Sequence, residues 1–217
     1  MRKITLIIFT VLLSNFSFAQ TTNFENYKLS SIGYISIPSK MEIQSGNYKK
    51  LAEEYQKEAG KKFGFEVSGN RIVFQQKGLN DFEKSGFASY ARVILETDIG
   101  SYGDYEKLTT NYTATQVEIS ELNKELKSQI QQSFAGTGLK LISWYGVSIT
   151  KINGRTAMKI SYLRQLNDNP YVVVNMYSFQ NNDRMHRLTL SYRQSDGTTW
   201  KPLFSSILNS FTITNVR

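Results

Sequence analysis

The sequence predicts an α+β fold, in which an antiparallel β-sheet is covered by amphipathic helices. Short segments of alternating apolar residues are joined by tight-turn signals, which favours antiparallel neighbours because parallel strands need long crossovers. Three longer segments repeat their apolar residues at three- and four-residue steps, which is typical of helices with one buried face. The hydrophobic content of 40% and the aromatic content of 13% are those of a globular chain.

Residues 1–19 are predicted to be a secretory signal peptide, and residues 20–217 a single domain. The positive start "MRK" precedes an apolar run from Ile4 to Leu13, and "SFA" places small residues at the −3 and −1 positions before Gln20. A membrane anchor is the weaker alternative, because a spanning helix needs about 20 apolar residues. We therefore expect an exported protein, periplasmic or extracellular, with no transmembrane segment after cleavage.

The sequence contains no cysteine, so the expected domain has no disulfide and no thiolate metal ligand. A lipid anchor that requires an acylated cysteine is excluded for the same reason. The fold must be held together by its core alone, and the predicted domain is long enough for that.

Four strands and a helix are predicted in the first half of the chain. Residues 27–43 read as an opening strand pair broken at Pro38. Residues 71–76 and 87–97 read as two further strands. The segment 47–63 reads as a helix with Asn47 as its N-cap. The helix stripe comprises Tyr48, Leu51, Tyr55, Ala59 and Phe63, and the shared face of strand 87–97 comprises Phe87, Ala91, Val93 and Leu95.

A second helix follows the long irregular segment 98–114. Thr115 and Glu118 have the spacing of a capping box, and Gly136 and Gly138 are expected to end the helix. Its predicted buried stripe comprises Ile119, Leu122, Leu126, Ile130 and Phe134.

From residue 139 the chain is predicted to form strand after strand, with a closing helix. The pair Asn153–Gly154 is a strong hairpin signal. In the closing helix Thr199 is the expected cap and Pro202 is expected in the first turn. The first strand should have Leu139, Leu141, Tyr145, Val147 and Ile149 on one side, the second should have Thr156, Met158, Ile160 and Tyr162 on one side, and the helix should bury Trp200, Leu203, Phe204, Ile207, Leu208 and Phe211.

The segments "ISIPSKMEI", "INGRTAMKISY" and "LFSSILNSF" resemble, in order and in turn placement, the PsbP-like α/β/α-sandwich family. The resemblance covers most of the expected domain and includes no catalytic motif. It implies an α/β/α sandwich and a protein that binds or assists other proteins. It supplies no functional residues, because a shared fold does not carry function with it.

His186 is the only histidine, and the alternation of its strand places it with Leu188, Leu190 and Tyr192 on the core side. We expect a structural histidine at the rim of the core, partly exposed and hydrogen-bonded. No serine stands in a nucleophile turn, and one histidine without cysteine does not build a usual zinc site.

Carboxylates are the second kind of candidate for a catalytic or metal-binding site. Asp98, Asp104 and Glu106 lie close together in one loop, but their spacing is not that of an EF-hand. Solvated loop acids are the better interpretation. The sequence thus predicts no catalytic residue, no metal site and no cofactor, and it favours a non-enzymatic protein without deciding the question.

Charge is the most specific remaining feature. The formal net charge is +8, and basic residues greatly outnumber acidic ones after residue 138. Arg155, Lys159, Arg187 and Arg193 fall on the non-core faces of their strands, so we expect one basic patch if these strands are close together. An acidic protein, an anionic glycan or a headgroup surface would suit it, whereas nucleic acid would not suit an exported protein. Simple solubility is the alternative reading of the charge.

The resulting hypothesis is an exported, non-enzymatic binding or accessory protein. The alternative from a different class is a hydrolase or small-ligand carrier with a pocket between sheet and helices. Composition and pattern leave the oligomeric state open.

Overall fold

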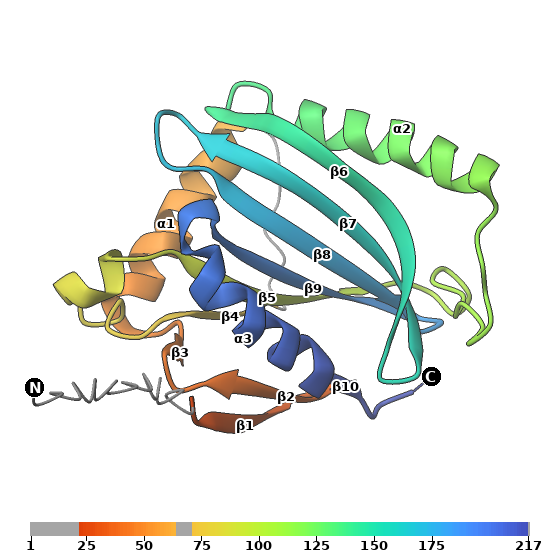
Figure 1. Cartoon of the computed structure of the whole chain (residues 1–217), viewed down its shortest axis with the longest axis horizontal. Helices are drawn as coiled ribbons and strands as arrows, with labels where there is room; N and C mark the ends of the chain where they lie inside the picture. The colour runs from red at the N-terminus through yellow and green to blue at the C-terminus, as the bar shows by residue number, and fades with distance from the viewer. Residues whose placement is uncertain (1–21, 64–70, 217) are drawn as a thin grey trace, which may run out of the picture.

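The computed structural model describes residues 22–63 and 71–216, which form two antiparallel sheets and three α-helices (Figure 1). The larger sheet has the strand order β3-β4-β5-β9-β8-β7-β6. Its strands are β3 (Met41–Ile43), β4 (Arg71–Gln76), β5 (Ala91–Ile99), β6 (Leu139–Ile152), β7 (Arg155–Leu166), β8 (Val172–Gln180) and β9 (Arg184–Arg193). The predicted α+β class with an antiparallel sheet is therefore confirmed.

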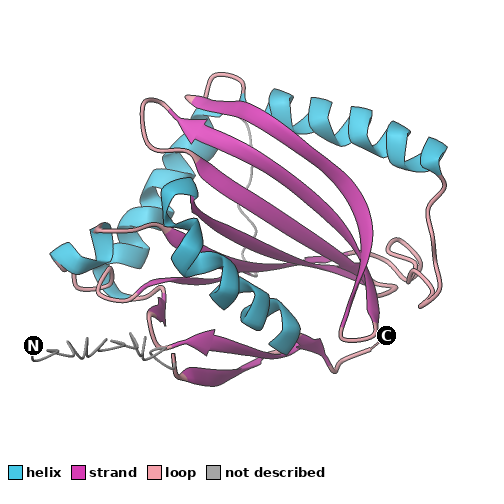
Figure 2. Ribbon diagram, viewed as in Figure 1, coloured by secondary structure: helices cyan, strands magenta, loops and turns pink. Residues whose placement is uncertain are grey.

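The smaller sheet has the order β1-β2-β10 and closes the core on one side of the larger sheet (Figure 2). It consists of β1 (Phe24–Leu29), β2 (Gly33–Pro38) and β10 (Thr212–Ile213). The helix α3 (Gly197–Ser210) packs on β2 and β9. The predicted stripe of this helix is confirmed, since Trp200, Phe204 and Ile207 are buried with Phe211 directly after its end. We call this covered face of the larger sheet the α3 face.

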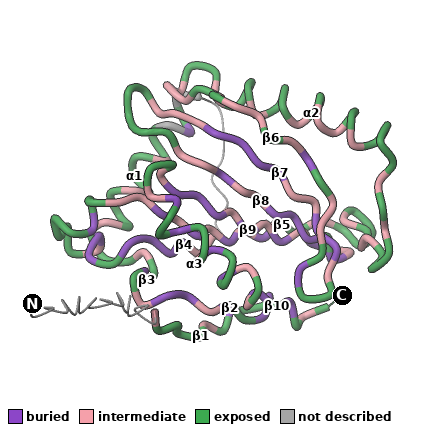
Figure 3. The backbone as a smooth tube through the Cα atoms, in the orientation of Figure 1, coloured by how far each residue is buried: buried purple, intermediate pink, exposed green. Residues whose placement is uncertain are grey.

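The opposite face of the larger sheet carries a second, smaller core beneath α2 (Gln116–Phe134). The predicted capping box is present, because Thr115 accepts from the backbone N–H of Glu118 and Glu118 accepts from the backbone N–H of Thr115. The outer side of α2 is exposed (Figure 3). The apolar side chains of the helix that meet the sheet are Leu122, Leu126, Ile130 and Phe134, and they pack around Val147, Ile160, Tyr162 and Val174. We call this the α2 face.

The helix α1 (Gly46–Phe63) also lies on the α2 face, over β4 and β5. Its Gln56 accepts a hydrogen bond from Arg71, and its Tyr48 accepts one from Arg92. The predicted apolar stripe does not provide this contact. Leu51 is 54% exposed and Tyr55 67% exposed, so the expectation that the stripe covers the sheet is wrong at these positions.

Local details also differ from the sequence predictions. Phe87 belongs to the 3-10 helix η1 (Lys84–Phe87) and is exposed, because β5 begins only at Ala91. Asn47 and Thr199 lie inside their helices, so neither is the N-cap, and Pro202 lies beyond the first turn of α3. The strand β9 is followed by a second 3-10 helix, η2 (Gln194–Asp196), before α3.

A β-bulge in β6 explains why Tyr145 is exposed, although it was predicted to lie on one side of the strand with Leu141 and Val147. The register of β6 against β7 shifts between Trp144 and Gly146, which turns Tyr145 toward solvent. Gly146 has φ of +108°, which favours glycine. Oδ1 of Asn123 on α2 accepts from the indole Nε1 of Trp144 at 2.8 Å and from the backbone N–H of Val147 at 3.0 Å. The bulge is therefore tied to the helix that covers it.

The predicted signal peptide at 1–19 lies outside the described residues. No helix among the residues that the structure describes has the length and apolar character needed to cross a membrane.

Candidate functional site

The four residues of the predicted basic patch lie on two opposite faces of the sheet. Residues paired in register share a face. Lys159 pairs with Tyr177, which pairs with Leu188, so Lys159 lies on the α3 face, as does Arg155. Arg187 and Arg193 lie on the α2 face. The expectation of one patch made by all four residues is therefore wrong.

The error has a simple physical origin. In β7 the apolar row of Met158, Ile160 and Tyr162 faces α2, whereas in β9 the apolar row of Leu188 and Leu190 faces α3. Alternation places residues correctly within each strand. Alternation alone does not reveal whether the apolar rows of two different strands face the same side of the sheet.

His186 lies in the core on the α3 face, as its position beside Leu188 and Leu190 predicted. The expectation of partial exposure is wrong, because its exposed fraction is 0%. Nδ1 of His186 lies 3.0 Å from Oγ1 of Thr97 on β5. Burial and, to a lesser extent, Arg184 lower the pKa of His186 to about 4, with Asp183 acting in the opposite direction. The ring is therefore neutral at physiological pH.

The α2 face of the central strands instead collects five arginines between α1 and α2. Arg71 pairs with Glu96 in register, and Glu96 pairs with Arg187, so these side chains share the face. Arg92 lies on the same face of β5. Arg193 and Arg164 both pair with Val172. We call Arg71, Arg92, Arg164, Arg187 and Arg193 the arginine cluster.

Two members of the cluster are neutralised by a chain of ion pairs. Glu96 contacts Arg71 at 3.6 Å and Arg187 at 3.5 Å, and Arg187 also contacts Asp98 at 3.0 Å. Burial lowers the pKa of Arg71, and Glu96 opposes that shift. These partly exposed ion pairs fix the side chains more than they stabilise the fold.

Arg193 is held at the end of β9. It donates to the backbone carbonyl of Ala88 at 3.1 Å and lies 3.8 Å from the carboxylate of Asp196. Arg187 and Arg193, the two residues of this face that the sequence analysis had selected, thus have carboxylate partners within the chain.

Arg92 and Arg164 differ from the other three arginines of the cluster, because neither has a carboxylate within ion-pair distance in residues 22–63 and 71–216. Both converge on Tyr90. The guanidinium of Arg164 donates to the Tyr90 hydroxyl at 3.4 Å, and that of Arg92 lies 5.7 Å from the centre of the Tyr90 ring. Ser191, which is paired with Arg92, hydrogen-bonds to the same hydroxyl. We call Tyr90, Arg92, Arg164 and Ser191 the Tyr90 site.

The positive charges of Arg92 and Arg164 act on the hydroxyl of Tyr90. Burial by itself would raise the pKa of Tyr90. Arg92 and Arg164, together with hydrogen bonds from Ser191 and Arg164, lower the pKa below its ordinary value of 10.0. The same positive charges and hydrogen-bond donors that stabilise the tyrosinate would stabilise a bound anion.

The sequence analysis missed Arg92 and Arg164, although one signal pointed to them. Arg92 lies between Ala91 and Val93, which were assigned to an apolar row, and Arg164 continues the row of Ile160 and Tyr162 as a charged residue. Their convergence depends on the strand order β5-β9-β8-β7, which places two strands between theirs. The order of elements along the chain does not reveal that arrangement.

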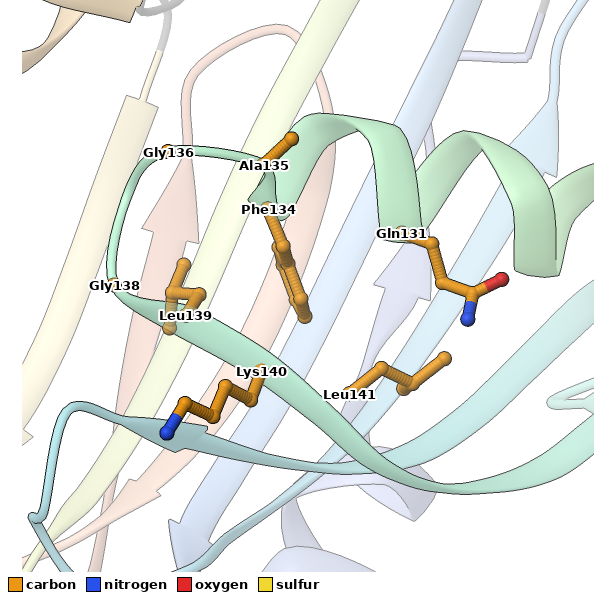
Figure 4. A pocket seen from close by; sticks show the side chains of 8 residues that line it. All are labelled: Gln131, Phe134, Ala135, Gly136, Gly138, Leu139, Lys140 and Leu141. Carbon is orange, nitrogen blue, oxygen red and sulfur yellow. The ribbon is translucent and has the colours of Figure 1, made fainter.

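Two hollows lie among the described residues. One, of about 400 Å³, lies between the last turn of α2 and the start of β6, where the ring of Phe134 points toward the strand (Figure 4). The other, of about 50 Å³, lies beside Arg155 and Lys107. His186 lines neither of them.

A metal centre has no evident ligand set in this part of the chain. Among the described residues, no three histidine or acidic side chains are grouped so that they could hold a metal ion. Asp98 pairs with Arg187, and Asp104 accepts from the backbone N–H of Ser101 at 2.6 Å. Asp98 and Asp104 thus have partners within the protein.

Comparison with solved structures identifies the fold. No family model and no curated protein matches the sequence. The structure is similar to cyanobacterial PsbP (CyanoP) from Synechocystis sp. PCC 6803, with a TM-score of 0.50 and 12% identity over 93% of this chain and 98% of that one. It is also similar to PA94 from Pseudomonas aeruginosa, a protein of unknown function, with a TM-score of 0.43 and 14% identity over 87% and 96% of the two chains.

The chain is therefore an α+β protein with a PsbP-like fold, as the resemblance in sequence order had implied. At this identity the similarity establishes the fold alone.

Proposed function

We propose that this protein is an exported, non-enzymatic binding or accessory protein that engages an acidic partner protein through the arginine cluster on its α2 face. The observation that carries the proposal is the pair Arg92 and Arg164. Both guanidinium groups meet at Tyr90, and neither has a carboxylate partner in the described part of the chain. Export is proposed from the leader-like residues 1–19.

An acidic protein suits this surface better than a uniformly anionic membrane or glycan. Glu96, Asp98 and Asp196 lie among the arginines and pair with three of them. A membrane or glycan whose negative charges are continuous would be repelled by these carboxylates. A protein can place separate carboxylates opposite Arg92 and Arg164 and avoid the acids.

Affinity capture tests the proposal. The mature protein is immobilised, incubated with envelope extract at low salt, and eluted with rising NaCl. We expect a partner whose retention falls as salt rises, because exposed charges are screened beyond about 8 Å at physiological ionic strength. The partner, identified by mass spectrometry and purified, is then titrated against the wild type and a doubly substituted Arg92→Gln, Arg164→Gln variant.

Lys159→Gln is a control for position, because it removes a positive charge from the opposite face of the sheet. We expect the double variant to bind the partner at least about tenfold more weakly and the control to bind it nearly as the wild type does. Capture that is insensitive to salt, or equal weakening by Lys159→Gln, would count against the proposal.

A further inference from the structure

The Tyr90 site has donors from three strands and the segment before β5, all directed to one place. Arg92 comes from β5, Ser191 from β9 and Arg164 from β7, while Tyr90 precedes β5. We propose that the Tyr90 site binds a single carboxylate group carried by an acidic segment of the partner protein. This inference rests on the proposed function and names the chemical group that the surface recognises.

The surroundings of the site strengthen its attraction for an anion. Val172 pairs with Arg164 and Arg193, and Val174 pairs with Ser191, so two valines of β8 lie between the polar groups. Val174 is buried and Val172 partly so. Charges next to such an apolar surface interact more strongly than charges in water, because the local dielectric constant is lower.

The donors are held in place before any ligand arrives. Arg92 lies over the Tyr90 ring and donates to the hydroxyl of Tyr48 on α1 at 3.3 Å. Ser191 is 3% exposed and fixed within β9. A guanidinium is a planar fork that matches a carboxylate with two parallel hydrogen bonds. Little side-chain entropy is therefore lost when a carboxylate binds.

The proposed partner is a protein, and the acidic groups of an unmodified protein are carboxylates, which the site must bind although Asp196 lies beside it. The carboxylate of Asp196 accepts from the backbone N–H of Tyr90 at 3.2 Å, which places a negative charge at the edge of the site. One guanidinium can hold a carboxylate of the partner with two parallel hydrogen bonds. The two arginines together can still attract the single charge.

Nuclear magnetic resonance of the mature protein, with its tyrosines labelled at the ζ-carbon, gives a direct test. The probe is an acetylated tri-glutamate amide, and the matched control peptide is its tri-glutamine counterpart. We expect the glutamate peptide to shift the Tyr90 resonance in a saturable manner and to raise the pKa of Tyr90, because the bound carboxylate opposes the two arginines. The glutamine peptide should cause neither change.

Substitutions identify the residues involved. Arg164→Gln should weaken the binding of the glutamate peptide at least about tenfold, and Lys159→Gln by less than about twofold. Circular dichroism checks that each variant is folded. If Arg164→Gln does not fold, the titration of the wild type still tests the inference, because the Tyr90 resonance must shift when the glutamate peptide is added.

Two outcomes would overturn the inference. One is a Tyr90 resonance that stays unchanged while the peptide binds elsewhere, and the other is inorganic phosphate binding at the Tyr90 site more tightly than the peptide. Either result can occur while the captured partner still binds in a salt-sensitive way and is bound more weakly by the Arg92→Gln, Arg164→Gln variant, because these arginines can attract an acidic partner without holding one carboxylate at Tyr90. Failure here is therefore distinguishable from failure of the proposed function.

Discussion

Thr97 and His186 face each other across β5 and β9, with Oγ1 of Thr97 and Nδ1 of His186 3.0 Å apart inside the core. The histidine ring is fully buried among Leu95, Leu188 and Phe179. Its Nε2 has no hydrogen-bond partner among the described residues. The only histidine is thus a packed core residue that contributes a pH-dependent term to stability.

We expect that term to destabilise the fold in acid. Burial is the main cause that lowers the pKa of His186 from 6.5 to about 4. Between these two values the unfolded chain binds a proton that the folded chain does not, so the free energy of unfolding falls as the pH falls. The loss approaches about 3 kcal/mol once the pH reaches 4.

Urea unfolding of the wild type and of His186→Gln between about pH 7.5 and pH 4 measures this effect. The variant lacks the titrating ring, so the wild type should lose more stability than the variant over this range. Two parallel pH profiles would show that the ring is not neutral and buried in the folded protein.

Phe204 should be one of the most important residues for stability. It is 4% exposed and contacts the rings of Tyr192 and Trp200, with centroid distances of 5.6 Å and 5.9 Å. Phe204→Ala should lower the free energy of unfolding by about 3–5 kcal/mol, because it leaves a cavity between α3 and the sheet. Ser205→Ala, an exposed change on the same helix, should be nearly neutral. Equal denaturation midpoints for the two variants would contradict the packing of α3.

Asn153 should stabilise the fold beyond its role in the turn. It has φ of +48°, and its side-chain amide donates to the carbonyls of Asn209 and Phe211, both at 2.7 Å. Asn153→Gly keeps the left-handed backbone accessible but removes both bonds, so we expect a loss of about 1–3 kcal/mol.

Asn167→Gly is the control for this prediction. Asn167 also has a positive φ, of +49°, in a turn, and its side chain makes no hydrogen bond within the described residues. The two free energies of unfolding are compared by denaturation. If both variants lose the same stability, the bonds of Asn153 to the end of α3 contribute nothing.

Export leads to a prediction about the N-terminus. We expect cleavage after Ala19, so that N-terminal sequencing of exported material begins at Gln20. The mature protein should then be recovered in solution without detergent. Recovery of the uncleaved chain in the membrane pellet would show that residues 1–19 act as an anchor.

Much of the fold could be predicted from local pattern. The capping box of Thr115 and Glu118 and the buried row of α3 were predicted residue by residue. The turn at Asn153–Gly154 was predicted as well, and both residues have positive φ. These features depend on neighbours within a few residues, where backbone chemistry and side-chain spacing decide the outcome.

The candidate site was predicted much less well. Arg187 was placed on the correct side of its own strand, yet Arg155 and Lys159 proved to lie on the other face of the sheet. The exposed stripe of α1 is a second example, because Leu51 has the spacing of a buried residue and 54% exposure. Periodicity shows that a face is apolar but not that another element covers it.

The sequence by itself determined the alternation of residues within β7 and β9, the turn at Asn153–Gly154 and the capping box that begins α2. Only the tertiary structure decided that the apolar rows of β7 and β9 face opposite ways and that Arg92 and Arg164 meet at Tyr90. The physical reason is that the alternation of side chains is a property of one strand. The face on which a side chain finds its neighbours depends on strand order, register and the helices above, which involve residues far apart in the chain.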